Sequence, residues 1–173
     1  MGDYKKRKSE PMSGDEVLAY LPGAKLIVYS DLVNYDNIDD VFGDCDIILF
    51  LYQMTSLYNG HWTILLRNRC TDHIHFFDSY GMKIDKELNY VSKNIKKLIG
   101  ADNKYLSKLL RKANYTITFN NCKYQKDGAN IQTCARHCIL RALNKNIDED
   151  FYHDFYFKNK KLSPDDIVSF LIK

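Results

Sequence analysis

The sequence has few of the features that mark membrane or secreted proteins. It contains no apolar run long enough to span a membrane and no apolar signal segment near its start. Its 5 cysteines are an odd number and include no paired C-x-x-C motif. We therefore expect no membrane contact, no disulfide framework and a reducing compartment.

Proline and glycine are also scarce, at 3 and 8 of 173 residues, and the net charge is only +3. With 45% hydrophobic residues, this composition is typical of a packed globular protein and argues against disorder. The length suits one hydrophobic core and is short for two. We predict a single, monomeric domain over residues 13–173, preceded by a flexible basic tail over residues 1–12.

The spacing of apolar residues predicts the secondary structure. Ser13 followed by Glu16 is the pattern of a helix capping box. Helical spacing predicts further helices over residues 85–99, 106–112, 133–143, 148–157 and from 163 onwards. β-branched and aromatic runs predict strands over residues 25–29, 46–53, 61–67, 73–78 and 115–119. The sequence therefore predicts an α+β fold in which helices flank a central, mainly antiparallel sheet.

The two strands predicted over residues 61–67 and 73–78 are close enough in the chain to form a hairpin. With a loop centred near Cys70, antiparallel pairing puts His61 opposite residue 78 or 79. Cβ atoms of cross-strand neighbours lie roughly 5 Å apart, so the Asp78 carboxylate can hold the His61 imidazole. Alone, such a pair is also typical of an ordinary protein surface.

Cys134 falls in the first turn of the helix predicted over residues 133–143. Backbone amides and the helix dipole favour a thiolate at that position, although a buried core thiol is the alternative. Cys138 lies one turn further and is expected to be an inert core residue. Upstream, Gln125 is predicted to end a strand and offers an amide donor for an oxyanion.

Other histidines and cysteines give weaker candidate sites. His137 is the rival to His61 as a base, but it would have to bend back past the helix start to reach Cys134. Two sets of residues resemble metal ligands without matching zinc spacings: Cys122 with Cys134, His137 and Cys138, and His73 with His75. We expect neither a metal nor another cofactor.

The order of these candidates along the chain resembles one family. His61-Trp62, Asp78, Gln125 and Cys134 follow one another as in the adenain-like and SUMO-protease-like cysteine proteases. Three motifs resemble the capsid-maturation proteases of virophages, Polinton elements and large DNA viruses: Gly60-His61-Trp62, Phe76-Phe77-Asp78-Ser79-Tyr80-Gly81 and Thr133-Cys134-Ala135-Arg136-His137 with Arg141. The resemblance covers residues 46–143 and implies a papain-like fold in permuted His, Asp, Cys order.

The resemblance also implies roles for the candidate residues. His61 would be the general base, Asp78 the residue that orients it and Cys134 the nucleophile. Gln125 would be the oxyanion donor, and Trp62 would pack beside the histidine.

Two positions depart from the family pattern. Ala135 stands where the family has glycine, which narrows the space beside the thiol. The family's glutamine lies six or seven residues before the cysteine, whereas Gln125 lies nine before it and Gln132 two before it. We prefer Gln125 because it closes the predicted strand.

The resemblance implies a cysteine endopeptidase that cleaves capsid precursor proteins at small, glycine-rich sites. Virion maturation would place it in the virion and in the virus factory of the host cytoplasm. Two alternatives remain: a protease that removes ubiquitin-like modifiers, and an inactive relative that binds nucleic acid. Residues 83–112 carry nine basic and three acidic residues, which fits either non-specific DNA contact or a solvated helix face. A DNA or peptide activator, as adenovirus proteases use, is a further expectation.

Overall fold

A five-stranded sheet forms the centre of the computed structural model, which describes residues 3–54, 60–100 and 103–173. The strands follow one another across the sheet in chain order: β1 (Ala24–Val28), β2 (Ile47–Gln53), β3 (Gly60–Asn68), β4 (His73–Phe77) and β5 (Thr116–Phe119). The three central strands pair antiparallel, while β1 with β2 and β4 with β5 pair parallel. The expected α+β fold is confirmed, with a sheet that is mixed at its two edges.

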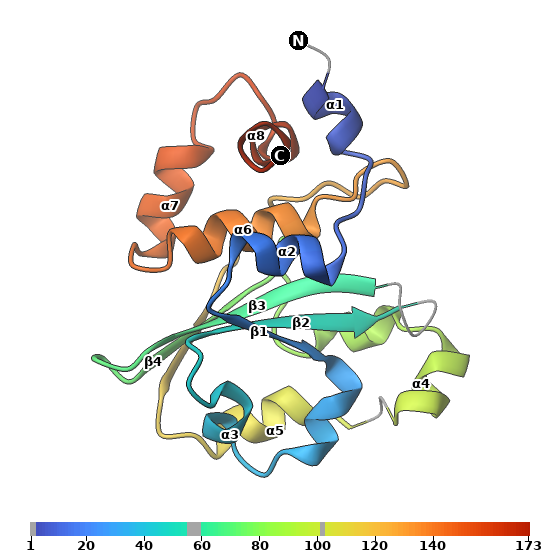
Figure 1. The fold of residues 1–173 in the computed structure, drawn as a ribbon, viewed down its shortest axis with the longest axis vertical. Coiled ribbons are helices and arrows are strands. Elements are labelled where there is room, and N and C mark those ends of the chain that lie inside the picture. Colours follow the sequence, from blue (N-terminus) through green and yellow to red (C-terminus); the bar gives the residue numbers. More distant parts are fainter. Residues whose placement is uncertain (1–2, 55–59, 101–102) are drawn as a thin grey trace.

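Helices cover both faces of this sheet (Figure 1). One side carries α1 (Asp3–Arg7), α2 (Gly14–Tyr20), α6 (Cys134–Leu143), α7 (Glu149–Tyr156) and α8 (Pro164–Leu171). The other side carries η1 (Tyr29–Asn34), α3 (Ile38–Phe42), η2 (Lys86–Tyr90), α4 (Lys93–Ile99) and α5 (Tyr105–Arg111). Within the part of the chain that the structure describes, no helix is long and apolar enough to cross a membrane.

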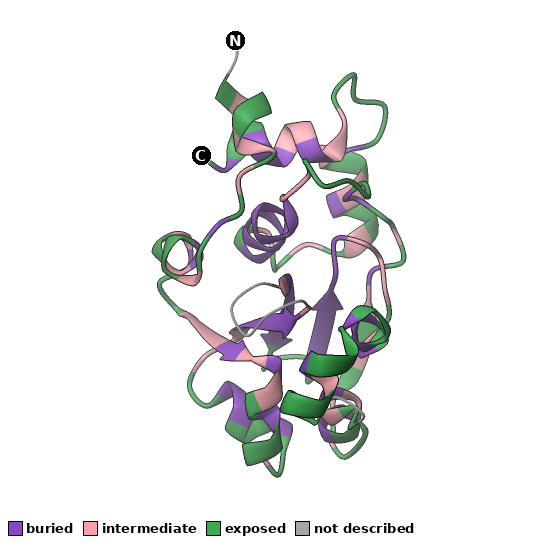
Figure 2. Ribbon diagram, turned by 90° about the vertical axis from the view of Figure 1, so that its right-hand side faces the viewer, coloured by how far each residue is buried: buried purple, intermediate pink, exposed green. Residues whose placement is uncertain are grey.

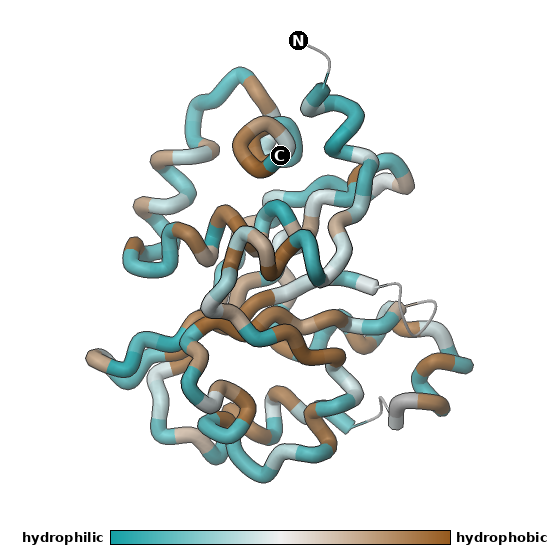
Figure 3. The backbone as a smooth tube through the Cα atoms, viewed as in Figure 1, coloured by the Kyte–Doolittle hydropathy of each residue, from teal (hydrophilic) through white to brown (hydrophobic). Residues whose placement is uncertain are grey.

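The two helix layers explain why β2 is apolar along its length. Successive side chains of a strand point to opposite faces. Leu49 and Leu51 accordingly join the core beneath α2 and α6, while Ile48 and Phe50 join the core beneath α3 and α5. Figure 3 shows the hydrophobic residues concentrated in these central strands. The sheet is therefore a rigid platform, buried from both sides, for residues at the strand ends.

Helix α6 is buried over almost its whole length. Residues 134–142 are all buried, and the helix appears as the mostly purple one near the centre of Figure 2. It lies against β3 on one side and α8 on the other. Its first residue, Cys134, is thereby fixed above the β3 strand that carries His61.

Two segments differ from the sequence expectations. Residues 85–99 are not one helix, because the chain leaves the helical path at Val91 and Ser92 caps a new helix by accepting from the Ile95 N–H. Leu98, at the end of this predicted helix, is exposed.

The segment expected as a flexible tail also differs. In its described part, Asp3–Arg7 form α1, and the Arg7 guanidinium donates to the Ser169 carbonyl at 2.9 Å. Lys8 pairs with Asp166 at 2.8 Å. These contacts attach the basic segment to α8, while residues 1 and 2 lie outside the described residues.

Candidate active site

His61 and Asp78 meet at the open end of the β3–β4 hairpin. Ile64 pairs with Phe77, and the same register extended along the hairpin puts His61 opposite residue 80. The sequence predicted residue 78 or 79 at that place. Asp78 is then a diagonal neighbour on the same face. The contact survives the shift, since His61 Nε2 lies 2.9 Å from Asp78 Oδ1 and both residues are buried.

Backbone and side-chain groups fix the Asp78 carboxylate. The Tyr80 N–H donates to Oδ1 at 2.8 Å, and the Asn120 side chain bonds both the N–H and the carbonyl of Asp78. The Tyr80 ring also stacks on the His61 imidazole, with 4.8 Å between ring centroids. Asn120 follows β5, the neighbour of β4, and the sequence analysis missed it. The His61 imidazole is therefore held at its edge by Asp78 and on its face by the Tyr80 ring.

Cys134 approaches the same imidazole from the start of α6. Among the neighbouring side chains, His61 influences its thiol most. Burial alone would raise the pKa of Cys134, but the bond and charge of His61, with backbone bonds from Trp62 and Ala135, lower that pKa below its ordinary value. Burial would likewise lower the pKa of His61, yet Asp78 and Cys134 raise it well above the usual range. These opposing shifts favour a thiolate beside an imidazolium.

Cys138 has a different environment although it lies one turn further along α6. It is fully buried, and its thiol donates to the Trp62 carbonyl at 3.5 Å. Burial, with the charges of Cys134 and Asp78, raises the pKa of Cys138 well above its ordinary value. The environment fits the inert core thiol expected from the sequence.

Gln125 is buried close to the loop that precedes Cys134. Its Oε1 accepts from the Ser79 hydroxyl at 2.7 Å, and its Nε2 donates to the Ile131 carbonyl at 3.2 Å. One Nε2 hydrogen is used in that bond and the amide has two. Gln125 does not end a strand, because β5 stops at Phe119. Gln132 is partly exposed, and its amide bonds the Ala129 carbonyl.

His137, the alternative candidate for the base, bonds a different carboxylate. Its Nε2 lies 3.2 Å from Asp165 Oδ1 in α8, and burial lowers the pKa of His137 despite that carboxylate. Asp165 also accepts from the Thr133 hydroxyl at 2.6 Å and from the Lys126 N–H at 3.1 Å. This buried carboxylate links α8 to the loop before Cys134.

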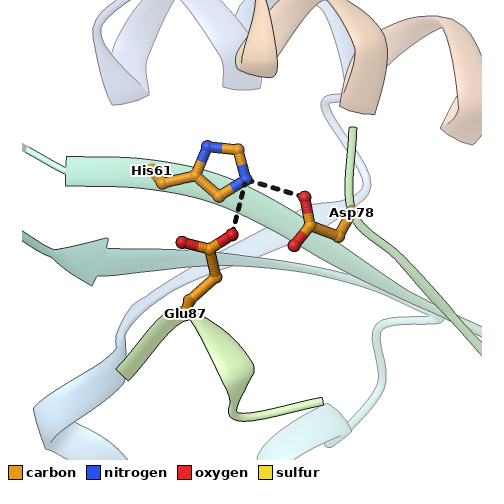
Figure 4. A group of neighbouring side chains, drawn as sticks. All are labelled: His61, Asp78 and Glu87. Atoms are coloured by element: carbon orange, nitrogen blue, oxygen red, sulfur yellow. Dashed lines mark hydrogen bonds and ion pairs between the residues drawn. The ribbon is translucent and has the colours of Figure 1, made fainter. Parts of the chain in front are cut away.

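Glu87 is a third buried group beside His61. Its Oε1 lies 3.8 Å from His61 Nε2, on the same side as Asp78 (Figure 4). Within residues 3–54, 60–100 and 103–173, His61, Asp78 and Glu87 are the one trio whose ligand atoms lie within 4.8 Å of one another. A metal ion there would have to replace the His61–Asp78 hydrogen bond, so the arrangement fits a hydrogen-bonded site better.

A cavity of about 790 Å³ opens at Gly60 and Trp62, the two chain neighbours of His61. The segment before α2 and the strands β1 to β3 line it, with apolar residues that include Met12, Leu26 and Leu51. Trp62 also lines the cavity, and its backbone bonds the Cys134 thiol. Cys134, His61 and Asp78 do not line this concave, largely apolar surface, and Trp62 is the residue that connects it to the site.

Comparisons with known proteins find a relative in a virophage. No protein-family model matches it. A Sputnik virophage protein, "Uncharacterized protein V9", is 33% identical to this chain over 175 residues. The alignment covers 99% of this chain and 99% of V9. The chain belongs to the V9 family. The identity extends over the whole V9-like chain and is therefore not confined to the motifs around His61 and Cys134.

A solved protease structure shares the fold. The pS273R protease of ASFV matches 95% of this chain and 68% of its own with a TM-score of 0.50 and 11% identity. The yeast Ulp1 protease domain, solved in complex with the SUMO ortholog Smt3, matches 98% of this chain and 80% of its own with a TM-score of 0.43 and 14% identity. This V9-family chain therefore has the fold of the pS273R protease, as the family resemblance implied.

Proposed function

We propose that the chain is a cysteine endopeptidase with Cys134 as its nucleophile. The observation that carries the proposal is that three buried side chains interact in order: Cys134 with His61, and His61 with Asp78. In this mechanism His61 takes the thiol proton, the thiolate adds to a peptide carbonyl, and His61 returns a proton to the leaving amine. Water then attacks the acyl-enzyme and releases Cys134.

Gln125 and a backbone amide would stabilise the oxyanion. The bonds of Gln125 to Ser79 and Ile131 support this role, because they hold its amide beside the loop that leads to Cys134. Ala135 lies inside α6 with an ordinary helical backbone and its backbone bonds the thiol, so the missing glycine causes no strain there.

Capsid precursor proteins are the proposed substrates, cut at small, glycine-rich sites in the virion or the virus factory. Membership of a virophage family and a fold shared with a viral protease support this proposal. Hydrolysis of fluorogenic Gly-Gly peptides and capsid-derived peptides, run beside ubiquitin-like modifier fusions, tests it. Cleavage of the peptides is expected. Cleavage of the fusions alone would favour the modifier-removing alternative, and no cleavage of either would contradict the peptidase proposal.

We also propose that residues 83–112 bind DNA and that this binding activates the proposed peptidase. Two of the three acids in this segment, Asp85 and Glu87, are buried, which leaves the surface more positive than the sequence count suggests. We expect the hydrolysis rate to rise with added duplex DNA and this activation to fall as salt increases. Charge reversal at Lys93 and Lys97, both exposed, should weaken the activation. A rate that does not change with DNA or salt would contradict the proposal.

A further inference from the structure

Glu87 is a buried acid placed against the candidate catalytic pair. It lies in η2, only 2% exposed, and its carboxylate points at the His61 ring from the side occupied by Asp78 (Figure 4). The second ring nitrogen of His61 lies on the opposite side of the ring, away from both carboxylates. Two carboxyl groups therefore approach the same nitrogen, Nε2, of one imidazole.

The hydrogen bonds around these carboxyl groups leave one oxygen of each without a donor. Asp78 Oδ1 accepts from His61 and Tyr80, but Asp78 Oδ2 and Glu87 Oε1 are buried with no donor bonded to them. Figure 4 shows the second oxygen of Asp78 turned toward Glu87. Buried polar atoms in folded proteins are rarely left unpaired. Two neighbouring carboxyl groups that share one proton satisfy one oxygen on each.

We propose that Glu87 is a positioning residue that stays protonated and donates a hydrogen bond to Asp78 Oδ2. Asp78 then carries the single negative charge that faces His61, and its carboxylate is fixed on both oxygens. This inference rests on the proposed peptidase function for its catalytic meaning, but the proton on Glu87 can be observed without any substrate.

The charges around Glu87 support a retained proton. Burial, and then the charge and hydrogen bond of Asp78, raise the pKa of Glu87 from 4.5 to about 8, against the opposing charge of His61. The charge of Glu87 also acts on two phenols, Tyr52 and Tyr80. Burial raises the pKa of Tyr52 on β2 well above its ordinary value and that of Tyr80 to about 12, so both stay neutral near pH 8.

The sign of the pH effect follows from that shift. The unfolded chain loses the Glu87 proton near pH 4.5 and the folded chain near pH 8. Stability from this group is complete below pH 4.5 and is lost progressively as the pH rises through about 8. Above that pH a second negative charge stands beside Asp78, and the two carboxylates repel each other.

Carbon-13 NMR of the chain labelled at glutamate carboxyl carbons tests the proton directly. One resonance is expected to titrate near pH 8, to be absent in Glu87→Gln and to remain in Cys134→Ser. A Glu87 resonance that titrates near its ordinary pH of 4.5 would overturn the proposal. This result does not depend on hydrolysis, so it is distinguishable from a failure of the peptidase proposal.

Paired variants test the positioning role. Glu87→Ala is expected to lower kcat about tenfold or more with little change in KM, because Asp78 loses its second hydrogen bond. Glu87→Gln keeps a neutral donor and should recover most of that loss while removing the change in rate near pH 8. The rate of Cys134 alkylation by iodoacetamide at pH 6 gives the same comparison without substrate. Equal impairment of the two folded variants would overturn the proposal.

Discussion

Replacing Cys134 with serine is expected to lower peptide hydrolysis by at least about 10³-fold. The hydrogen bond and charge of His61 make the thiol more acidic than usual, whereas a serine hydroxyl at the same place is far less acidic and is not ionised by that imidazole. The side chains are nearly the same size, so the fold should be kept. Initial rates on the fluorogenic peptide, with circular dichroism to confirm folding, provide the measurement.

Cys138→Ser is the matched control for this variant. Cys138 lies in the same helix, is also buried, and donates to the Trp62 carbonyl, a bond that a serine hydroxyl can also make. We expect it to keep the rate within about tenfold, because a single buried substitution of this kind acts mainly on stability. If Cys138→Ser lost as much activity as Cys134→Ser, the assignment of the nucleophile would be wrong.

Replacing His61 with glutamine is expected to have an effect of similar size, at least about 10³-fold on kcat/KM. Glutamine can still bond Asp78 but cannot take the thiol proton at neutral pH. The loss of the imidazolium also removes the main influence that lowers the pKa of Cys134, so burial should push that pKa upward. The residual rate should therefore increase toward alkaline pH. Rates measured from pH 5.5 to 9 show both effects.

His137→Gln separates this role from a structural one. His137 is also buried and also bonds a carboxylate, Asp165, which anchors the loop before Cys134. This variant should lower thermal stability and leave the shape of the pH–rate profile unchanged. An active His61→Gln beside a folded but inactive His137→Gln would make His137 the base.

The sequence predicted the elements whose periodicity is strong. The capping box at Ser13 and Glu16 is present at the start of α2, and the wholly apolar run of β2 is covered on both faces. The hairpin register could not be fixed, because it depends on how residues 69–72 turn, with Asp72 in a left-handed conformation. The His61–Asp78 contact tolerated that error because strand side chains alternate with period two.

The groups around the candidate site were harder to predict. Asn120, Asp165 and Glu87 reach it from three distant segments, and no local pattern marks them. Glu87 in particular belongs to a segment that reads as a basic helix face, where an acid is expected to be solvated. Only the packing of η2 beneath His61 shows that this carboxyl group is buried.

Alkylation of Cys134 tests the central claim, an activated thiol paired with His61, most directly. Thiolate is the reactive form, and an ordinary cysteine loses it tenfold per pH unit below about 8.5. Mass spectrometry after iodoacetamide treatment at pH 6 is expected to find Cys134 modified faster than the exposed Cys70, although Cys134 is only 9% exposed. His61→Gln should abolish that advantage. Modification of Cys134 no faster than that of Cys138 would contradict the account.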